Sequence, residues 1–138
     1  MRKLAAVISG YVLWTIVWLV GNACLRGGGV LPADDAQPIH DAGPLLLMIG
    51  LGVICSVSAG CLAGAIAPSS SRSNLVILGI LLFASGVYFE LAGWNLMPIW
   101  YHCVFLGMLF PATFAGGRIR RRLGAGTKGG VPARAADH

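Results

Sequence analysis

Charged residues are scarce in this chain. Asp, Glu, Lys and Arg together make up 11% of the 138 residues, against about 25% in soluble domains. Hydrophobic residues account for 57%, and the 20 glycines come in addition. This number of charges is too small to cover the surface of a soluble protein of this size. We therefore expect much of the surface to contact lipid. The length suffices for one compact domain.

The sequence also lacks the common catalytic motifs. It contains no phosphate-binding Gly-rich loop with Lys, no His-Glu-x-x-His, no Gly-x-Ser-x-Gly and no Ser/His/Asp set at a matching depth. None of the four cysteines stands in a Cys-x-x-Cys metal-binding spacing. The sequence therefore favours a protein that is not an enzyme and that needs no metal or cofactor.

The net charge of +5 raises the question of nucleic-acid binding. The basic residues cluster near the chain ends and do not form a face interleaved with aromatic residues, as a nucleic-acid surface requires. We therefore expect no nucleic-acid partner.

The main feature of the sequence is a set of four long apolar stretches. A membrane-spanning helix needs about 20 mainly apolar residues, and the stretches 4–25, 44–67, 75–95 and 98–117 meet this requirement. The predicted fold class is all-α, an integral membrane bundle of four transmembrane helices within residues 1–122. Residues 123–138 are rich in Gly and Ala without periodicity, which predicts a disordered cytoplasmic tail.

Several boundaries have a local cause. Pro44 suits the first turn of a helix, where a missing N–H costs nothing. Pro68 and the serines after it end the second stretch, and Ser73 or Asn74 is the expected N-cap of the third. The first apolar stretch, of about 22 residues, is longer than the 7–15 of a signal peptide, so we expect it to be retained as a helix.

The distribution of Lys and Arg predicts the orientation in the membrane. With both chain ends inside, the cytoplasmic side receives nine basic residues: Arg2, Lys3, Arg72, Arg118, Arg120, Arg121, Arg122, Lys128 and Arg134. Only Arg26 falls outside. Because cytoplasmic loops carry the excess of Lys and Arg, this predicts an N-in/C-in, multi-pass protein, with a bacterial cytoplasmic membrane as the expected location.

Glu90 is the most informative single residue. A carboxylate within a membrane helix is costly and marks a functional-site hypothesis with a partner to be named. Leu96 marks the centre of the predicted turn. Glu90 lies six residues before Leu96, and His102 lies six residues after Leu96. The two side chains are therefore expected at the same depth, as a polar intramembrane pair. Such a pair could relay protons, hold a metal with help or lock two helices together, and Glu90 could instead reach the headgroups.

Rows of small residues predict close helix packing. In the second stretch, Gly52, Ser56, Gly60 and Gly64 recur at a spacing of four, which lets another helix approach closely. Leu51 lies off this row and is expected to face lipid. The third stretch has Gly79, Gly86 and Gly93 at a spacing of seven, which makes it the expected neighbour of the second. The row leaves open a partner helix in the same chain or in another chain.

The first stretch carries a polar and aromatic stripe. Tyr11, Trp14, Trp18 and Asn22 follow one another at spacings of three, four and four. Such a stripe could line a site for a lipid, a quinone or another flat apolar ligand. The alternative interpretation, which we favour, is a stripe that faces lipid or the membrane interface.

The remaining polar groups are interpreted as structural. Cys55 and Cys61 point in different directions and are expected to pack as small apolar residues, whereas Cys24 and Cys103 could form a disulfide on the outer side. The outer loop offers possible metal ligands at Asp34, Asp35, His40 and Asp41, but its Gly and Pro content favours a solvated loop without metal. The run containing Arg118, Arg120, Arg121 and Arg122 is expected to anchor the topology and to contact anionic lipid headgroups.

Two functional hypotheses follow. The first is a small non-enzymatic membrane protein, an accessory or structural subunit that packs through its Gly/Ser faces against a larger membrane partner or its own copies. The alternative is a small oligomeric transporter or proton-coupled carrier that uses Glu90 and His102. The carrier ranks second because the inner halves of the last two helices show few polar residues, namely Asn74, Ser85 and Thr113.

Overall fold

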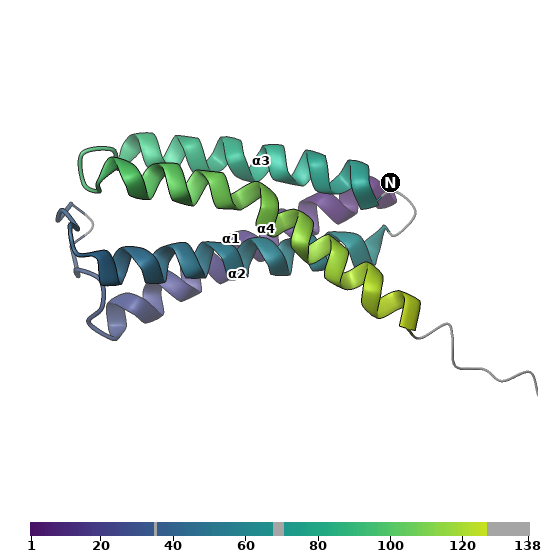
Figure 1. The fold of residues 1–138 in the computed structure, drawn as a ribbon, viewed down its shortest axis with the longest axis horizontal. Coiled ribbons are helices and arrows are strands. Elements are labelled where there is room, and N and C mark those ends of the chain that lie inside the picture. Colours follow the sequence, from purple (N-terminus) through teal and green to yellow (C-terminus); the bar gives the residue numbers. More distant parts are fainter. Residues whose placement is uncertain (35, 68–70, 127–138) are drawn as a thin grey trace, which may run out of the picture.

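The computed structural model describes residues 1–34, 36–67 and 71–126, and within these ranges the chain is all-helical. It forms α1 (Arg2–Gly27), α2 (Ala42–Ile66), α3 (Ser71–Ala92) and α4 (Ile99–Gly126), with no strand in the described ranges (Figure 1). All four helices are long and apolar enough to cross a membrane. The prediction of four long apolar helices is confirmed, and the chain has the character of a multi-pass membrane protein.

The helix bounds differ by a few residues from the sequence prediction, and two of the differences are informative. α3 begins at Ser71, so Ser73 and Asn74 lie inside the helix and the predicted N-cap there is wrong. α4 continues to Gly126 instead of ending at residue 117, and residues 123–126 are helical where a disordered tail was predicted. Membrane thickness limits the apolar length of a helix but not its total length, and Arg and Leu favour helix in water as well. The predicted tail from residue 127 onward lies outside the described residues.

The fourth helix, α4, packs on both α2 and α3. The most extensive helix contact is between α2 and α4, followed by that between α1 and α2, while α3 packs mainly on α4. In Figure 1, α4 runs beside α3 over its first half and then crosses α2. Pro111 lies within α4, and a proline inside a helix removes one backbone hydrogen bond and bends the axis.

The α1–α2 loop and the α3–α4 turn lie at the same end of the bundle and contact each other. The backbone N–H of Ile39, in the α1–α2 loop, donates to the carbonyl of Leu96 in the α3–α4 turn at 2.8 Å. The chain start, the beginning of α3 and the end of α4 lie at the opposite end (Figure 1). The bundle therefore has a loop end, which holds Glu90 and His102, and an opposite end, which holds most of the basic residues.

The outward faces are apolar, as lipid contact requires. Large hydrophobic side chains with at least half of their surface exposed occur on every helix, among them Ile8, Ile16, Leu19, Leu46, Ile54, Ile77, Ile80 and Ile99. The core between the helices is also apolar and includes Ala59, Leu78 and Leu109. Polar side chains inside this core are therefore few, and each one needs a partner.

Candidate functional site

The site begins with the short reversal between α3 and α4. The N–H of Leu96 donates to the carbonyl of Gly93 at 2.9 Å, and the N–H of Tyr101 donates to the carbonyl of Pro98 at 3.0 Å. These bonds close the turn and start α4 at once. The last turn of α3 therefore lies directly opposite the first turn of α4.

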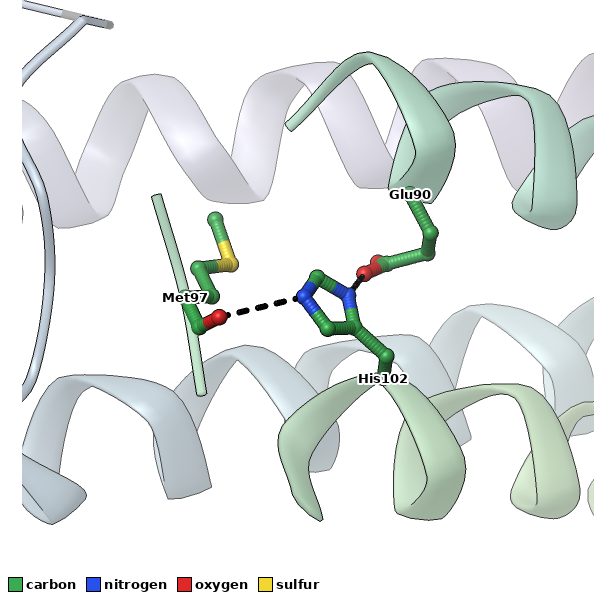
Figure 2. Close-up of polar contacts among 3 residues, drawn as sticks. All are labelled: Glu90, Met97 and His102. Atoms are coloured by element: carbon green, nitrogen blue, oxygen red, sulfur yellow. Dashed lines mark hydrogen bonds and ion pairs between the residues drawn. The ribbon is translucent and has the colours of Figure 1, made fainter. Parts of the chain in front are cut away.

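Glu90 and His102 meet across this hairpin. Figure 2 shows the Glu90 side chain reaching from α3 to His102 on α4, where its Oε2 contacts Nδ1 of the imidazole. The other ring nitrogen, Nε2, lies 3.2 Å from the carbonyl oxygen of Met97 in the turn. The side chain of His102 is 1% exposed and that of Glu90 is 10% exposed. The pair is thus enclosed by protein, and both ring nitrogens have partners.

The position of the protons follows from these partners. A carbonyl oxygen can only accept a hydrogen bond, so Nε2 of His102 must carry a hydrogen and donate it to Met97. The contact between Nδ1 and Glu90 then requires one more proton, held either by the imidazole or by the carboxyl group. The pair is electrically neutral as a whole in both cases, which lowers the cost of placing it in a membrane.

Aromatic rings surround the imidazole. The Trp94 ring stacks on His102 with centroids 4.6 Å apart and an interplanar angle of 10°. Tyr101 meets the same imidazole edge to face, at 5.7 Å and 74°. Tyr101 is fully buried, and its hydroxyl has no hydrogen-bond partner among the described residues. These rings keep water from the imidazole and hold it in one orientation.

The stripe on α1 packs on the other three helices. Trp14 Nε1 donates to Ser56 Oγ of α2 at 3.2 Å, and the Tyr11 hydroxyl is hydrogen-bonded to Ser85 Oγ of α3 at 3.1 Å. Trp18 stacks on Trp14 and contacts the ring of Phe105 in α4. The stripe is therefore occupied by neighbouring helices, and the expectation that it faces lipid or the interface is wrong for Trp14, which is buried.

The last stripe residue serves its own helix. Asn22 Nδ2 donates to the carbonyl of Trp18 at 2.9 Å, and Thr15 makes the same kind of bond to Tyr11. These bonds run back along α1 to backbone carbonyls of the preceding turn. The described hydrogen bonds of the stripe are thus all with the protein itself.

The small-residue row of α2 faces α4. A Cβ at Gly52 would lie 2.7 Å from the Phe105 ring, and a Cβ at Gly60 would collide with the backbone of Thr113. Gly64 faces Gly117, and Ser56 in the same row accepts the bond from Trp14. All four row residues are buried. The row is therefore used within the chain, and only other surfaces remain for a partner.

The glycines of α3 also face α4. A Cβ at Gly79 would lie 3.0 Å from Phe110, and one at Gly86 would lie 2.9 Å from Leu109. Gly93 lies beyond the end of α3 and belongs to the turn. The expectation that these glycines bring α3 against α2 is thus wrong, because α4 is their neighbour. The spacing of seven defines a face of the helix but does not say which helix covers it.

The matching small residues on α4 escaped the sequence analysis. A Cβ at Gly116 would collide with the backbone of Val57, and one at Gly117 would collide with Leu75. Ala112 and Gly116 stand four apart, as do Thr113 and Gly117. This small-residue spacing is the signal that pairs α4 with α2.

Leu51 differs from the expectation that it faces lipid, and the possible disulfide between Cys24 and Cys103 is not formed. A Cβ at Gly21 would collide with Leu51, so Leu51 packs on α1 and is not simply lipid-facing. All four cysteines fall within the described ranges, and each is free, including the exposed Cys24 and Cys103. Cys61 donates its S–H to the carbonyl of Gly116, which adds to the α2–α4 contact.

A local hydrogen bond in the outer loop involves one of the predicted metal ligands. Asp34 Oδ1 accepts the backbone N–H of Ala36 at 3.0 Å, which is an ordinary turn interaction. Asp35 lies outside the described residues. The described part of the chain contains no group of three His, Cys, Asp or Glu side chains able to hold a metal ion. The loop residues His40 and Asp41 are both exposed.

Comparisons with protein-family models, with curated proteins and with solved structures found no match to this chain.

Proposed function

We propose that the chain is a small non-enzymatic membrane protein, an accessory or structural subunit that packs against a larger membrane partner or against its own copies. The observation that supports this most is the arrangement around His102. Both ring nitrogens are engaged, the ring is stacked by Trp94, and the side chain is 1% exposed. This arrangement suits a fixed link between two helices more than a site that must bind and release an ion.

The other internal polar contacts support the same proposal. Trp14 bonds to Ser56 and Tyr11 bonds to Ser85, so α1 is tied to both α2 and α3. In lipid, polar contacts between helices supply specificity where apolar packing alone supplies little. These contacts tie the helices to one another, and the exposed apolar faces remain for lipid or a partner.

The proposed orientation places both chain ends in the cytoplasm, with the loop end outside and the membrane that of a bacterial cell. The nine-to-one distribution of Lys and Arg carries this part. Reporters active on one side only, fused after Ala136 or inserted near Asp35, test it. The first position is expected to be cytoplasmic and the second periplasmic. The reverse pattern at either position would overturn the orientation.

A photo-crosslinking experiment tests the accessory role. A photoreactive amino acid placed at Ile16, Ile54 or Ile80 lies on an outward face, whereas one at Leu82, which is fully buried, serves as the inward control. In native membranes, at least one outward position is expected to give an adduct of discrete mass with another protein or a second copy. Adducts with lipid alone at all outward positions would contradict the proposal.

A proton-coupled carrier is the second candidate. The observation in its favour is that two buried polar side chains have no partner among the described residues: the Tyr101 hydroxyl near the loop end and the Asn74 amide near the opposite end. Free polar groups of this kind could form parts of a proton path. Leu75, Leu78, Leu82 and Leu109 are also fully or almost fully buried, so the interior of the bundle is largely apolar. The carrier therefore stays second.

A further inference from the structure

A pocket lined by arginines lies at the end of the bundle opposite Glu90 and His102. Arg72 of α3, together with Phe114, Arg118 and Arg121 of α4, encloses a pocket of about 300 Å³. The three α4 residues follow at spacings of four and three, so they lie on one face of that helix. Arg72 reaches the same place because the start of α3 packs on α4, as the contact between Leu75 and Gly117 shows.

The carboxylates that the structure describes are far from this pocket. Asp34 and Asp41 lie in the α1–α2 loop, and Glu90 is in the last turn of α3. Glu90 and Arg72 are 18 residues apart on one helix, which corresponds to about 27 Å along the axis. This separation exceeds the Debye length of about 8 Å at physiological salt. Within the described ranges, no carboxylate therefore balances these three guanidinium groups.

The pocket also lies at the depth of lipid headgroups. From Ile99 to Gly117, α4 has 19 residues without a charged Lys, Arg, Asp or Glu, and these span about 28 Å, close to the hydrocarbon thickness of about 30 Å. Arg118 therefore comes at the boundary of the hydrocarbon layer. Phe114 lies one helical turn deeper, where the glycerol and the first acyl carbons of a lipid would be.

We propose that this pocket binds the phosphate-bearing headgroup of an anionic lipid, with a preference for a headgroup that carries two negative charges. Guanidinium groups bind phosphate oxygens in pairs of parallel hydrogen bonds. Three of them match a phosphomonoester or a pair of phosphates better than one phosphodiester, and basic pockets between membrane helices suit such headgroups. That the bound lipid belongs to the cytoplasmic leaflet rests on the proposed orientation, whereas the binding of the lipid does not.

Binding is tested on the full chain in a neutral detergent. Native mass spectrometry would follow titrations with dioctanoyl phosphatidic acid, dioctanoyl phosphatidylglycerol and dioctanoyl phosphatidylcholine, which carry two, one and no net negative charges. One equivalent of phosphatidic acid is expected to bind most tightly and phosphatidylcholine least. Inorganic phosphate in millimolar excess is the competitor. If it displaces phosphatidic acid completely, the ligand is free phosphate and the lipid proposal fails.

Paired variants separate the pocket from the general basic belt. Arg118→Gln with Arg121→Gln removes two lining residues, whereas Arg120→Gln with Arg122→Gln removes two arginines of the same run that do not line it. The first pair is expected to weaken phosphatidic acid binding by about thirtyfold. The second pair is expected to weaken it by no more than about threefold. Equal losses in the two pairs would show diffuse attraction and overturn the proposal.

A single variant tests the contribution of α3. Arg72→Gln is expected to weaken binding by about fivefold, and Arg2→Gln, which removes a charge outside the pocket, is the matched control. No effect of Arg72→Gln would overturn a pocket between two helices.

The double variant Arg118→Lys with Arg121→Lys keeps the charge of the pocket but loses the paired hydrogen bonds, so an affinity between those of the wild type and the glutamine pair is expected. Helix content by circular dichroism checks that each variant is folded. A wrong membrane orientation would change the result of the reporter experiment and leave these binding results unchanged.

Discussion

Glu90 in the last turn of α3 is hydrogen-bonded to Nδ1 of His102 in the first turn of α4, while the Met97 carbonyl in the turn accepts a hydrogen bond from Nε2 of the same imidazole. The carbonyl of Met97 thereby keeps a hydrogen on Nε2. The hairpin holds a polar pair that is neutral as a whole, and the ring of Trp94 covers it. This combination links the two helices close to the loop end.

The first prediction concerns the coupling between these two residues. Glu90→Leu leaves the imidazole without its carboxyl partner, and His102→Phe keeps the stacking on Trp94 but leaves the carboxyl group unpaired. Each change is expected to destabilise the bundle by about 1–3 kcal/mol. The double variant is expected to lose about 1–2 kcal/mol less than the sum of the two. Reversible unfolding in detergent measures all three variants, and additivity within about 0.5 kcal/mol would show that the two side chains do not interact.

The second prediction concerns the contact between α2 and α4. Gly60→Ala is expected to destabilise the protein by about 1–3 kcal/mol, because the new methyl group meets the backbone of Thr113, which cannot move alone. Gly50→Ala is the control on the same helix, since open space surrounds that position. The control is expected to be neutral or to stabilise by up to about 1 kcal/mol through helix propensity. Thermal melts in detergent in which both variants behave alike would show that α4 does not cover Gly60.

These two contacts differ in how far the sequence predicts them. The equal spacing of Glu90 and His102 from Leu96 indicates equal depth, because a short turn forces two helices into a known register. Gly60 could only be assigned to a helix face. Its partner depends on how four helices arrange around one another, and spacing along one helix contains no information on that arrangement.

The long course of α4 was missed for a related reason. Hydropathy marks where a helix leaves the hydrocarbon layer, near Arg118, but the helix itself continues to Gly126. Likewise, the orientation of the stripe with Trp14 depends on Ser56 and on Phe105, which come from two other helices. Tertiary contacts decide such orientations, and a single amphipathic pattern cannot.

The third prediction concerns the hydrogen bond between α1 and α2. Ser56→Ala removes the acceptor of Trp14 Nε1 in a fully buried place, and the expected cost is about 0.6–1.7 kcal/mol, the range for such bonds between membrane helices. Ser58→Ala is the control, because Ser58 bonds only to the carbonyl of Ile54 in its own helix. The control is expected to change stability by less than about 0.5 kcal/mol. Equal effects in a detergent unfolding assay would contradict a role of Ser56 between the helices.

The second part of this test uses the donor. Trp14→Phe alone loses the indole N–H and part of the buried ring, so it is expected to destabilise the protein. When it is combined with Ser56→Ala, no unpaired hydroxyl remains, so the added cost of Ser56→Ala is expected to fall close to zero. A full additional cost in the double variant would show that Trp14 is not the partner of Ser56.

Proton flux tests the central claim, that the Glu90–His102 pair is a fixed link between α3 and α4 and does not conduct protons. The wild-type chain and Glu90→Gln would be reconstituted into liposomes loaded with a pH-sensitive dye, and a protonophore added at the end shows that the vesicles are tight. Gln can still hydrogen-bond to the imidazole, so the variant is expected to remain folded. The account predicts that both proteins give the flux of protein-free liposomes. A wild-type flux well above that level, lost in Glu90→Gln at an unchanged melting temperature, would contradict it and establish the carrier.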